Sequence, residues 1–241
     1  MDSVAQQFAL YVRDGELDRD LLSVGSKPVA FKDLPSLLDG KYIYPKEDSD
    51  IGGILHALFS DQSSLTYIND DLQDDNAAML LARHDVAYIA FHDYQKPSID
   101  HLIRLGVLEN TGARVQLANV EQFLILNALF TTQAASYYRL SLAGQAEVDA
   151  MIGKGWATRR SSLLTEAEGK YFNYFLNAQE FSNGPELRNK YIHGSQANTE
   201  GEDAHFHTYL IALRMTLALV IKINDDFVLA ATNRAAQERP R

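Results

Sequence analysis

A long apolar stretch near the C-terminus, from about Ala204 to Leu229, limits the folds open to this chain. Its pattern predicts a helix with apolar side chains on most faces, which must be buried in a bundle or at an interface. The most apolar part, Tyr209 to Ile223, contains Arg214 and Lys222 and is shorter than the roughly 20 residues that cross a bilayer. We therefore expect a mostly α protein with no membrane span.

The second half of the sequence, residues 120–241, predicts an antiparallel bundle of helices. Asn119 can cap a run from Val120 to about Ile152, and the pattern Thr165-x-x-Glu168 is a capping box that opens the next helix. A short helix then follows an Asn-Gly-Pro-Glu sequence at residues 183–186, ahead of the long apolar stretch. Four to five helices are expected in this domain.

The first half, residues 1–119, has shorter elements separated by breakers and predicts a small α+β domain. A helix from Ser98 to Gly106 is followed by two β-rich runs around a turn, over Val107 to Leu117. This helix and hairpin are similar to the last helix and wing of a winged-helix module. Further predicted elements are a strand over 42–44, helices over 31–38 and 51–59, and a longer helix that Asp75 or Asn76 can cap and that runs through Phe91.

Charge and composition narrow the function classes. Residues 1–120 hold 10 Lys/Arg against 19 Asp/Glu, within a net charge of −10 for the chain. Such a half is repelled by phosphate backbones, so it fits docking of a protein partner or antitoxin better than nucleic-acid binding. The absence of cysteine excludes disulfides and thiolate metal sites. We expect no cofactor and, since the N-terminus lacks a signal-peptide pattern, a cytoplasmic protein.

One short predicted helix carries a set of residues that could do chemistry. Asn189 and His193 are four residues apart and share a helix face, and the long side chain of Arg188 can reach the same place. An arginine that grips phosphate oxygens beside a histidine that moves protons is the minimum set for cleaving RNA without a metal. The 2′-hydroxyl would be the internal nucleophile.

The sequence Arg-Asn-x-x-x-His-Gly at residues 188–194 resembles the motif of the HEPN superfamily (higher eukaryotes and prokaryotes nucleotide-binding domains). The resemblance covers about residues 120–230 and implies a helical bundle that usually dimerises. It also implies that many members are metal-independent endoribonucleases of toxin–antitoxin, abortive-infection or other antiphage systems. Arg188 and His193 match the catalytic pair of the motif, and Asn189 matches its polar position.

Two readings of these residues stay open. Arg188 could instead pair with Glu186 while His193 caps the end of its helix, in a non-catalytic dimerisation or protein-interaction module. Additional RNA contacts are expected from Lys190, Arg159 and Arg160, although a solvated loop also accounts for the arginine pair. A homodimer is expected because four apolar residues of the last helix fall near a three–four repeat: Tyr209, Leu213, Leu217 and Val220.

Overall fold

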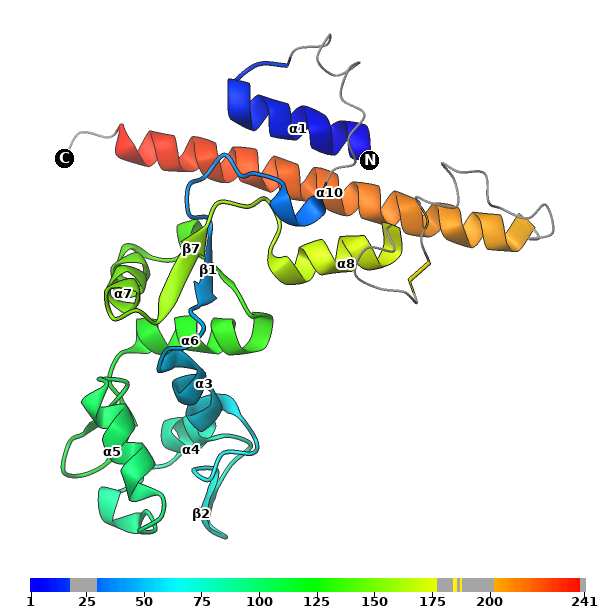
Figure 1. Cartoon of the computed structure of the whole chain (residues 1–241). Helices are drawn as coiled ribbons and strands as arrows, with labels where there is room; N and C mark the ends of the chain where they lie inside the picture. Colours follow the sequence, from blue (N-terminus) through cyan, green and yellow to red (C-terminus); the bar gives the residue numbers. More distant parts are fainter. Residues whose placement is uncertain (18–29, 177–183, 186, 188–201, 239–241) are drawn as a thin grey trace. The chain divides into compact units, whose positions relative to one another are not determined.

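The computed structural model describes residues 1–17, 30–176, 184, 185, 187 and 202–238, and it is mostly helical (Figure 1). The chain divides into two compact units. Unit 2 is the continuous segment Tyr42–Arg159, and unit 1 combines Met1–Lys41 with Arg160–Arg241. The boundary expected at residue 119 falls inside unit 2, and the two ends of the chain together form unit 1.

Unit 2 packs five α-helices and a small sheet around one apolar core. The sheet has the order β6-β1-β7, with β1 antiparallel to β6 through the pairs Tyr42↔Ser136 and Ile43↔Ala135. The helices are α3 (Ile51–Phe59), α4 (Ala77–Arg83), α5 (Lys96–Arg104), α6 (Val120–Thr132) and α7 (Leu142–Gly153). The sheet strands are β1 (Tyr42–Pro45), β6 (Ala135–Ser136) and β7 (Ala157–Arg160), of which the last residue is counted with unit 1. Single 3-10 turns lie at Tyr88–Ala90 (η2) and Tyr137–Arg139 (η3).

Several local predictions in unit 2 are confirmed. The Asn76 side chain caps α4 by accepting a hydrogen bond from the Met79 amide at 2.9 Å. Asn119 likewise accepts from the Glu121 amide at the start of α6. The predicted hairpin is β4 (Leu108–Asn110) paired with β5 (Val115–Leu117), directly after α5. A second, very short hairpin pairs β2 (Tyr67–Asn69) with β3 (Leu72–Gln73).

Three expected helices differ from the structure. The single run expected over 120–152 is two helices, because Gln133 takes the left-handed conformation at φ 60° and the chain then pairs with β1. As α6 and α7 belong to unit 2, the helices expected as one bundle are divided between the units. The helix expected to reach residue 91 ends at Arg83, and only one 3-10 turn, η1 (Phe31–Asp33), forms within residues 31–38.

Unit 1 is built around α10 (Glu202–Gln237), with α1 (Asp2–Asp14), η1 and α8 (Glu166–Leu176). Phe8 of α1 meets Phe227 edge-on at a ring separation of 5.9 Å, and Phe31 stacks on Phe172 at 5.1 Å. The predicted capping box at the start of α8 is confirmed. The Thr165 amide donates to Glu168 Oε2 at 2.9 Å, and the Glu168 amide donates to Thr165 Oγ1 at 3.2 Å.

One face of α10 is buried and the opposite face is exposed, so packing within the protomer covers only one side of this helix. Met215, Leu219 and Asp226 are buried in unit 1. Large apolar side chains on the other side are exposed, among them Phe206, Leu217 and Ile221. By length and composition alone, His205–Ala236 could cross a membrane, and this segment is longer than the run that the sequence pattern indicates.

Candidate functional site

The residues of the predicted catalytic motif, Arg188, Asn189 and His193, lie outside the described residues, as does Lys190. The structure does describe two neighbours that precede them. Leu187 is buried in the apolar core of unit 1. A Cβ placed on Gly184 would overlap the carbonyl oxygen of Tyr174, so only glycine fits where the chain passes α8. Both contacts attach the start of the motif segment to unit 1.

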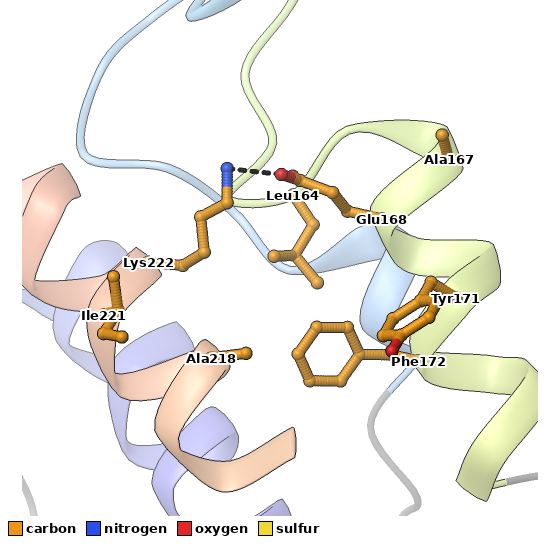
Figure 2. Close-up of a pocket in the computed structure, with 8 residues that line it drawn as sticks. All are labelled: Leu164, Ala167, Glu168, Tyr171, Phe172, Ala218, Ile221 and Lys222. Carbon is orange, nitrogen blue, oxygen red and sulfur yellow. Dashed lines mark ion pairs between the residues drawn. The ribbon is translucent and has the colours of Figure 1, made fainter. Parts of the chain in front are cut away.

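Helix α8, which precedes the motif segment, has a hollow on each of two faces. The hollow that faces α10 has a volume of about 450 Å³ and is mostly apolar (Figure 2). Phe172, Leu164 and Ala218 form its floor, and an ion pair between Lys222 Nζ and Glu168 Oε1, 2.6 Å apart, lies at one side. Its remaining lining residues are Ala167, Tyr171 and Ile221.

The polar groups of this apolar hollow are already engaged. Glu168 uses one carboxylate oxygen for Lys222 and the other for the Thr165 amide of the capping box. Apart from this ion pair and the Tyr171 side chain, the lining residues are apolar. The volume is within the range of small-ligand pockets, but its chemistry suits an apolar group rather than a reacting one.

The hollow on the other face of α8 is polar and has a volume of about 360 Å³. Lys32, Arg160 and Lys170 line it together with Asp33 and Glu166. Arg160 forms an ion pair with Glu166. We call the three cations of this hollow the α8 cation cluster. Lysine and arginine side chains gathered in this way are typical of sites that contact phosphate groups.

The close approach of η1 to α8 brings Lys32 into this cluster. Gly169 permits it, because a Cβ at that position would lie 3.2 Å from the Lys32 Cα. Lys32 is distant from Arg160 and Lys170 in the sequence, so no local pattern could have indicated the cluster. Sequence reasoning identified Arg160 alone and missed both lysines.

The structure separates the two predicted RNA-contacting arginines. Consecutive residues of a strand point to opposite faces, and Arg159 turns into unit 2 while Arg160 lines the polar hollow. The Arg159 guanidinium carbon lies 3.4 Å from the ring centroid of Tyr137. Burial, reinforced by the charge of Asp149, raises the pKa of Tyr137, and the charge of Arg159 opposes this. Arg159 therefore packs on an aromatic ring of unit 2, whereas Arg160 pairs with Glu166 in unit 1.

No group of three or more His, Asp or Glu side chains that could hold a metal ion occurs among the described residues. Comparison of the chain with protein-family models, curated proteins and solved structures found no match.

Proposed function

We propose that the chain is a metal-independent endoribonuclease of HEPN type, which cleaves RNA through attack by the 2′-hydroxyl. The observation that carries the proposal is the sequence Arg-Asn-x-x-x-His-Gly at residues 188–194, directly ahead of α10. In the proposed reaction, the 2′-oxygen bonds to phosphorus and gives up its proton to a base. The bond from phosphorus to the 5′-oxygen breaks, and that oxygen takes a proton from an acid.

Arg188 and His193 have distinct roles in this scheme. Arg188 holds the scissile phosphate and stabilises the negative charge that builds on it in the transition state. His193, at the end of its predicted helix, has its protonated form favoured by the helix dipole, which suits the acid. Because each chain supplies one such histidine, two motifs across the axis of a homodimer would provide both acid and base. The products are a 2′,3′-cyclic phosphate and a 5′-hydroxyl.

Features of unit 1 support the proposal. In the sequence, the motif segment comes between two helices of the unit, α8 and α10, which is the order expected for a HEPN-like helical bundle. The α8 cation cluster belongs to the same unit and offers charge for flanking phosphates of an RNA strand. In unit 2, α5 with the β4–β5 hairpin is the proposed winged-helix-like part. With 8 Lys/Arg against 15 Asp/Glu, unit 2 suits docking of a protein regulator, such as an antitoxin, in a cytoplasmic defence system.

Incubation of the full chain with total RNA in EDTA tests the activity. We expect cleavage with cyclic-phosphate ends, and a loss of roughly 10²-fold or more in rate for Arg188→Ala and for His193→Ala. His101→Ala, which removes an exposed histidine of α5, is the matched control and should cleave as the wild type does. Activity that needs a divalent metal, or that survives in both motif variants, would refute the proposal.

A second candidate function is a non-catalytic dimerisation or interaction module. The exposed apolar face of α10 specifically favours it, because such a surface is typical of a protein–protein contact. An oligomer that cleaves no RNA in either the wild type or the variants would establish this reading in place of the ribonuclease.

A further inference from the structure

On the exposed face of α10, large apolar residues recur at regular intervals. Five apolar residues are exposed in succession at intervals of four, three, four and three: Phe206, Leu210, Leu213, Leu217 and Val220. The next interval of four reaches Asn224, which is also exposed. We call these six residues the α10 seam. Their mean spacing of about 3.5 residues is the heptad repeat, with Leu210, Leu217 and Asn224 at the a positions.

The seam lies opposite the face by which α10 packs into its own unit. At about 100° per residue, Leu213 and Leu217 lie about 160° away from Met215 on either side of the helix. Met215 and Leu219 are buried, and Asp226 on the same side accepts hydrogen bonds inside unit 1. Rotating α10 to hide the seam would therefore expose this core face. Within one protomer, the packing of α10 is incompatible with burial of the seam.

We propose that the α10 seam is the surface through which two copies of this chain pair, as a parallel, in-register, two-stranded coiled coil in which Asn224 meets Asn224 of the partner subunit. The proposal deepens the homodimer part of the proposed function by assigning its surface, and it does not depend on ribonuclease activity. Asn224 is the residue expected to fix the alignment of the two helices. A polar asparagine at an a position stabilises the alignment in which it faces its own copy, because any other alignment buries its amide against apolar side chains.

The exposed apolar area on and beside the seam is close to what a stable dimer needs. The five apolar residues, with Tyr209, Ile221 and Val228 beside them, are between 40% and 66% exposed. If a large apolar side chain offers roughly 150–200 Å² when free, eight that are half exposed offer on the order of 700 Å² per protomer. A stable interface needs about 800 Å² from each partner. The apolar side chains thus supply most of this area before any polar rim is counted.

A lipid bilayer fits the same face less well. A bilayer has no structure that would select a seven-residue repeat, and it would leave the Asn224 amide without a partner. Insertion of the whole helix would carry Asp226 away from Lys41 into the apolar interior. The net charge of −10 also opposes binding to anionic lipid surfaces. A second copy satisfies the apolar side chains and the amide together.

Oligomeric state in solution is the first test, with the full chain at tens of micromolar in light scattering. We expect a dimer for the wild type and a monomer for the double variant Leu213→Glu/Leu217→Glu. Ile89→Glu is the matched control: it places the same charge on an exposed apolar residue of unit 2 and should remain dimeric. Unchanged far-ultraviolet circular dichroism will show that the double variant is folded. A monomeric wild type, including one that sediments with lipid vesicles, or a dimer that survives the double substitution, would overturn the proposal.

Cross-linking tests the direction of pairing. Because the chain has no cysteine, an introduced thiol is the only one in each protomer. Single variants Phe206→Cys and Val220→Cys place thiols about 21 Å apart along the helix, at 1.5 Å per residue. In a parallel, in-register dimer each thiol meets its own copy, so a short thiol–thiol cross-linker should join both variants into dimers. An antiparallel pair could bring at most one of these positions to the dimer axis. Cross-linking of one variant alone, or of neither, would contradict the parallel register.

The role of Asn224 is tested separately by Asn224→Leu. Removal of the polar side chain should strengthen association and weaken its selectivity, so that species larger than the dimer appear in sedimentation velocity. A variant that stays a single dimer with an unchanged dissociation constant would show that Asn224 does not set the register. None of these experiments measures RNA cleavage, so a negative result for the dimer can be distinguished from a negative result for the ribonuclease proposal.

Discussion

Lys41 Nζ lies 2.7 Å from Asp226 Oδ1, and both side chains are almost completely buried in unit 1. Asp226 also accepts a hydrogen bond from the Ser36 hydroxyl at 2.7 Å, and its second oxygen accepts one from the Leu37 amide at 2.7 Å. This carboxylate therefore fixes the segment between η1 and β1 to the middle of α10. It joins the N-terminal and C-terminal parts of the chain from which unit 1 is built.

Breaking this buried pair should cost far more stability than breaking an exposed one. We expect Asp226→Leu to lower the free energy of unfolding by about 3–5 kcal/mol, because it leaves the Lys41 ammonium buried without its counter-charge. The double variant Lys41→Met/Asp226→Leu should recover part of the loss. Arg13→Met, at the exposed pair with Asp14, should leave the free energy of unfolding nearly unchanged, because solvent screens that pair. Urea denaturation measures all three, and equal effects at the two pairs would contradict the expected dependence on burial.

Gln95 joins the stretch between α3 and β2 to the start of α5. Its fully buried amide donates to the carbonyls of Ser64 at 2.6 Å and Tyr67 at 2.9 Å, and its oxygen accepts from the His92 amide. Gln95→Leu leaves these three groups without partners and should destabilise unit 2 by about 1–3 kcal/mol. Gln62→Leu, at an exposed position, is the control and should stay within about 0.5 kcal/mol of the wild type in thermal and urea unfolding.

The α8 cation cluster predicts a change in the salt dependence of RNA binding. In the His193→Ala background, Lys32→Ala/Lys170→Ala should weaken binding of a labelled single strand. It should also reduce the slope of log affinity against log salt by about 0.7 per lost phosphate contact. Lys46→Ala, at an exposed lysine of unit 2, should leave that slope unchanged. Fluorescence anisotropy at several salt concentrations measures the affinity and the slope. Identical slopes for the double variant and its parent would show that the cluster does not contact the RNA.

The raised pKa of Tyr137 predicts that the folded protein loses stability in alkaline solution. Its pKa is raised in the folded protein, first by burial and then by Asp149, above the value of about 10 in an unfolded chain. Its contribution is therefore complete below about pH 10 and is lost as the pH rises through the folded-state pKa. Relative to Tyr137→Phe, the wild type should lose stability in urea unfolding as the pH rises above about 10. Parallel curves for the two proteins would contradict this.

Much of the local structure could be predicted because it depends on neighbours in the chain. Three helix starts are capped by side chains that accept hydrogen bonds from amides two or three residues later: Asn76, Asn119 and Thr165. The residues that determine where such a helix begins therefore lie within one helical turn of each other. The β4–β5 hairpin is similarly local. By contrast, the break at Gln133 left no such signal, because its left-handed conformation accompanies the pairing of β6 with a strand about 90 residues earlier.

Residues distant in sequence decided what local patterns left open. The predicted motif at Arg188 and His193 came from a short segment, and that segment lies outside the described residues. The lysines beside Arg160 were missed because Lys32 reaches α8 only through the packing of η1 against Gly169. The division of the chain into two units likewise depends on contacts between its ends, which no sequence window contains.

Helix α10 shows most clearly which features depend on local sequence and which depend on tertiary contacts. Sequence alone determined that residues 204–229 form an apolar helix with a three–four repeat, because periodicity is a property of consecutive side chains. Only the tertiary structure decided which face is used within the protomer. The burial of Asp226 with Lys41, and of Met215 and Leu219 in the core, turns the repeat outward. A helix has one orientation about its own axis, and contacts made by the rest of the chain set it.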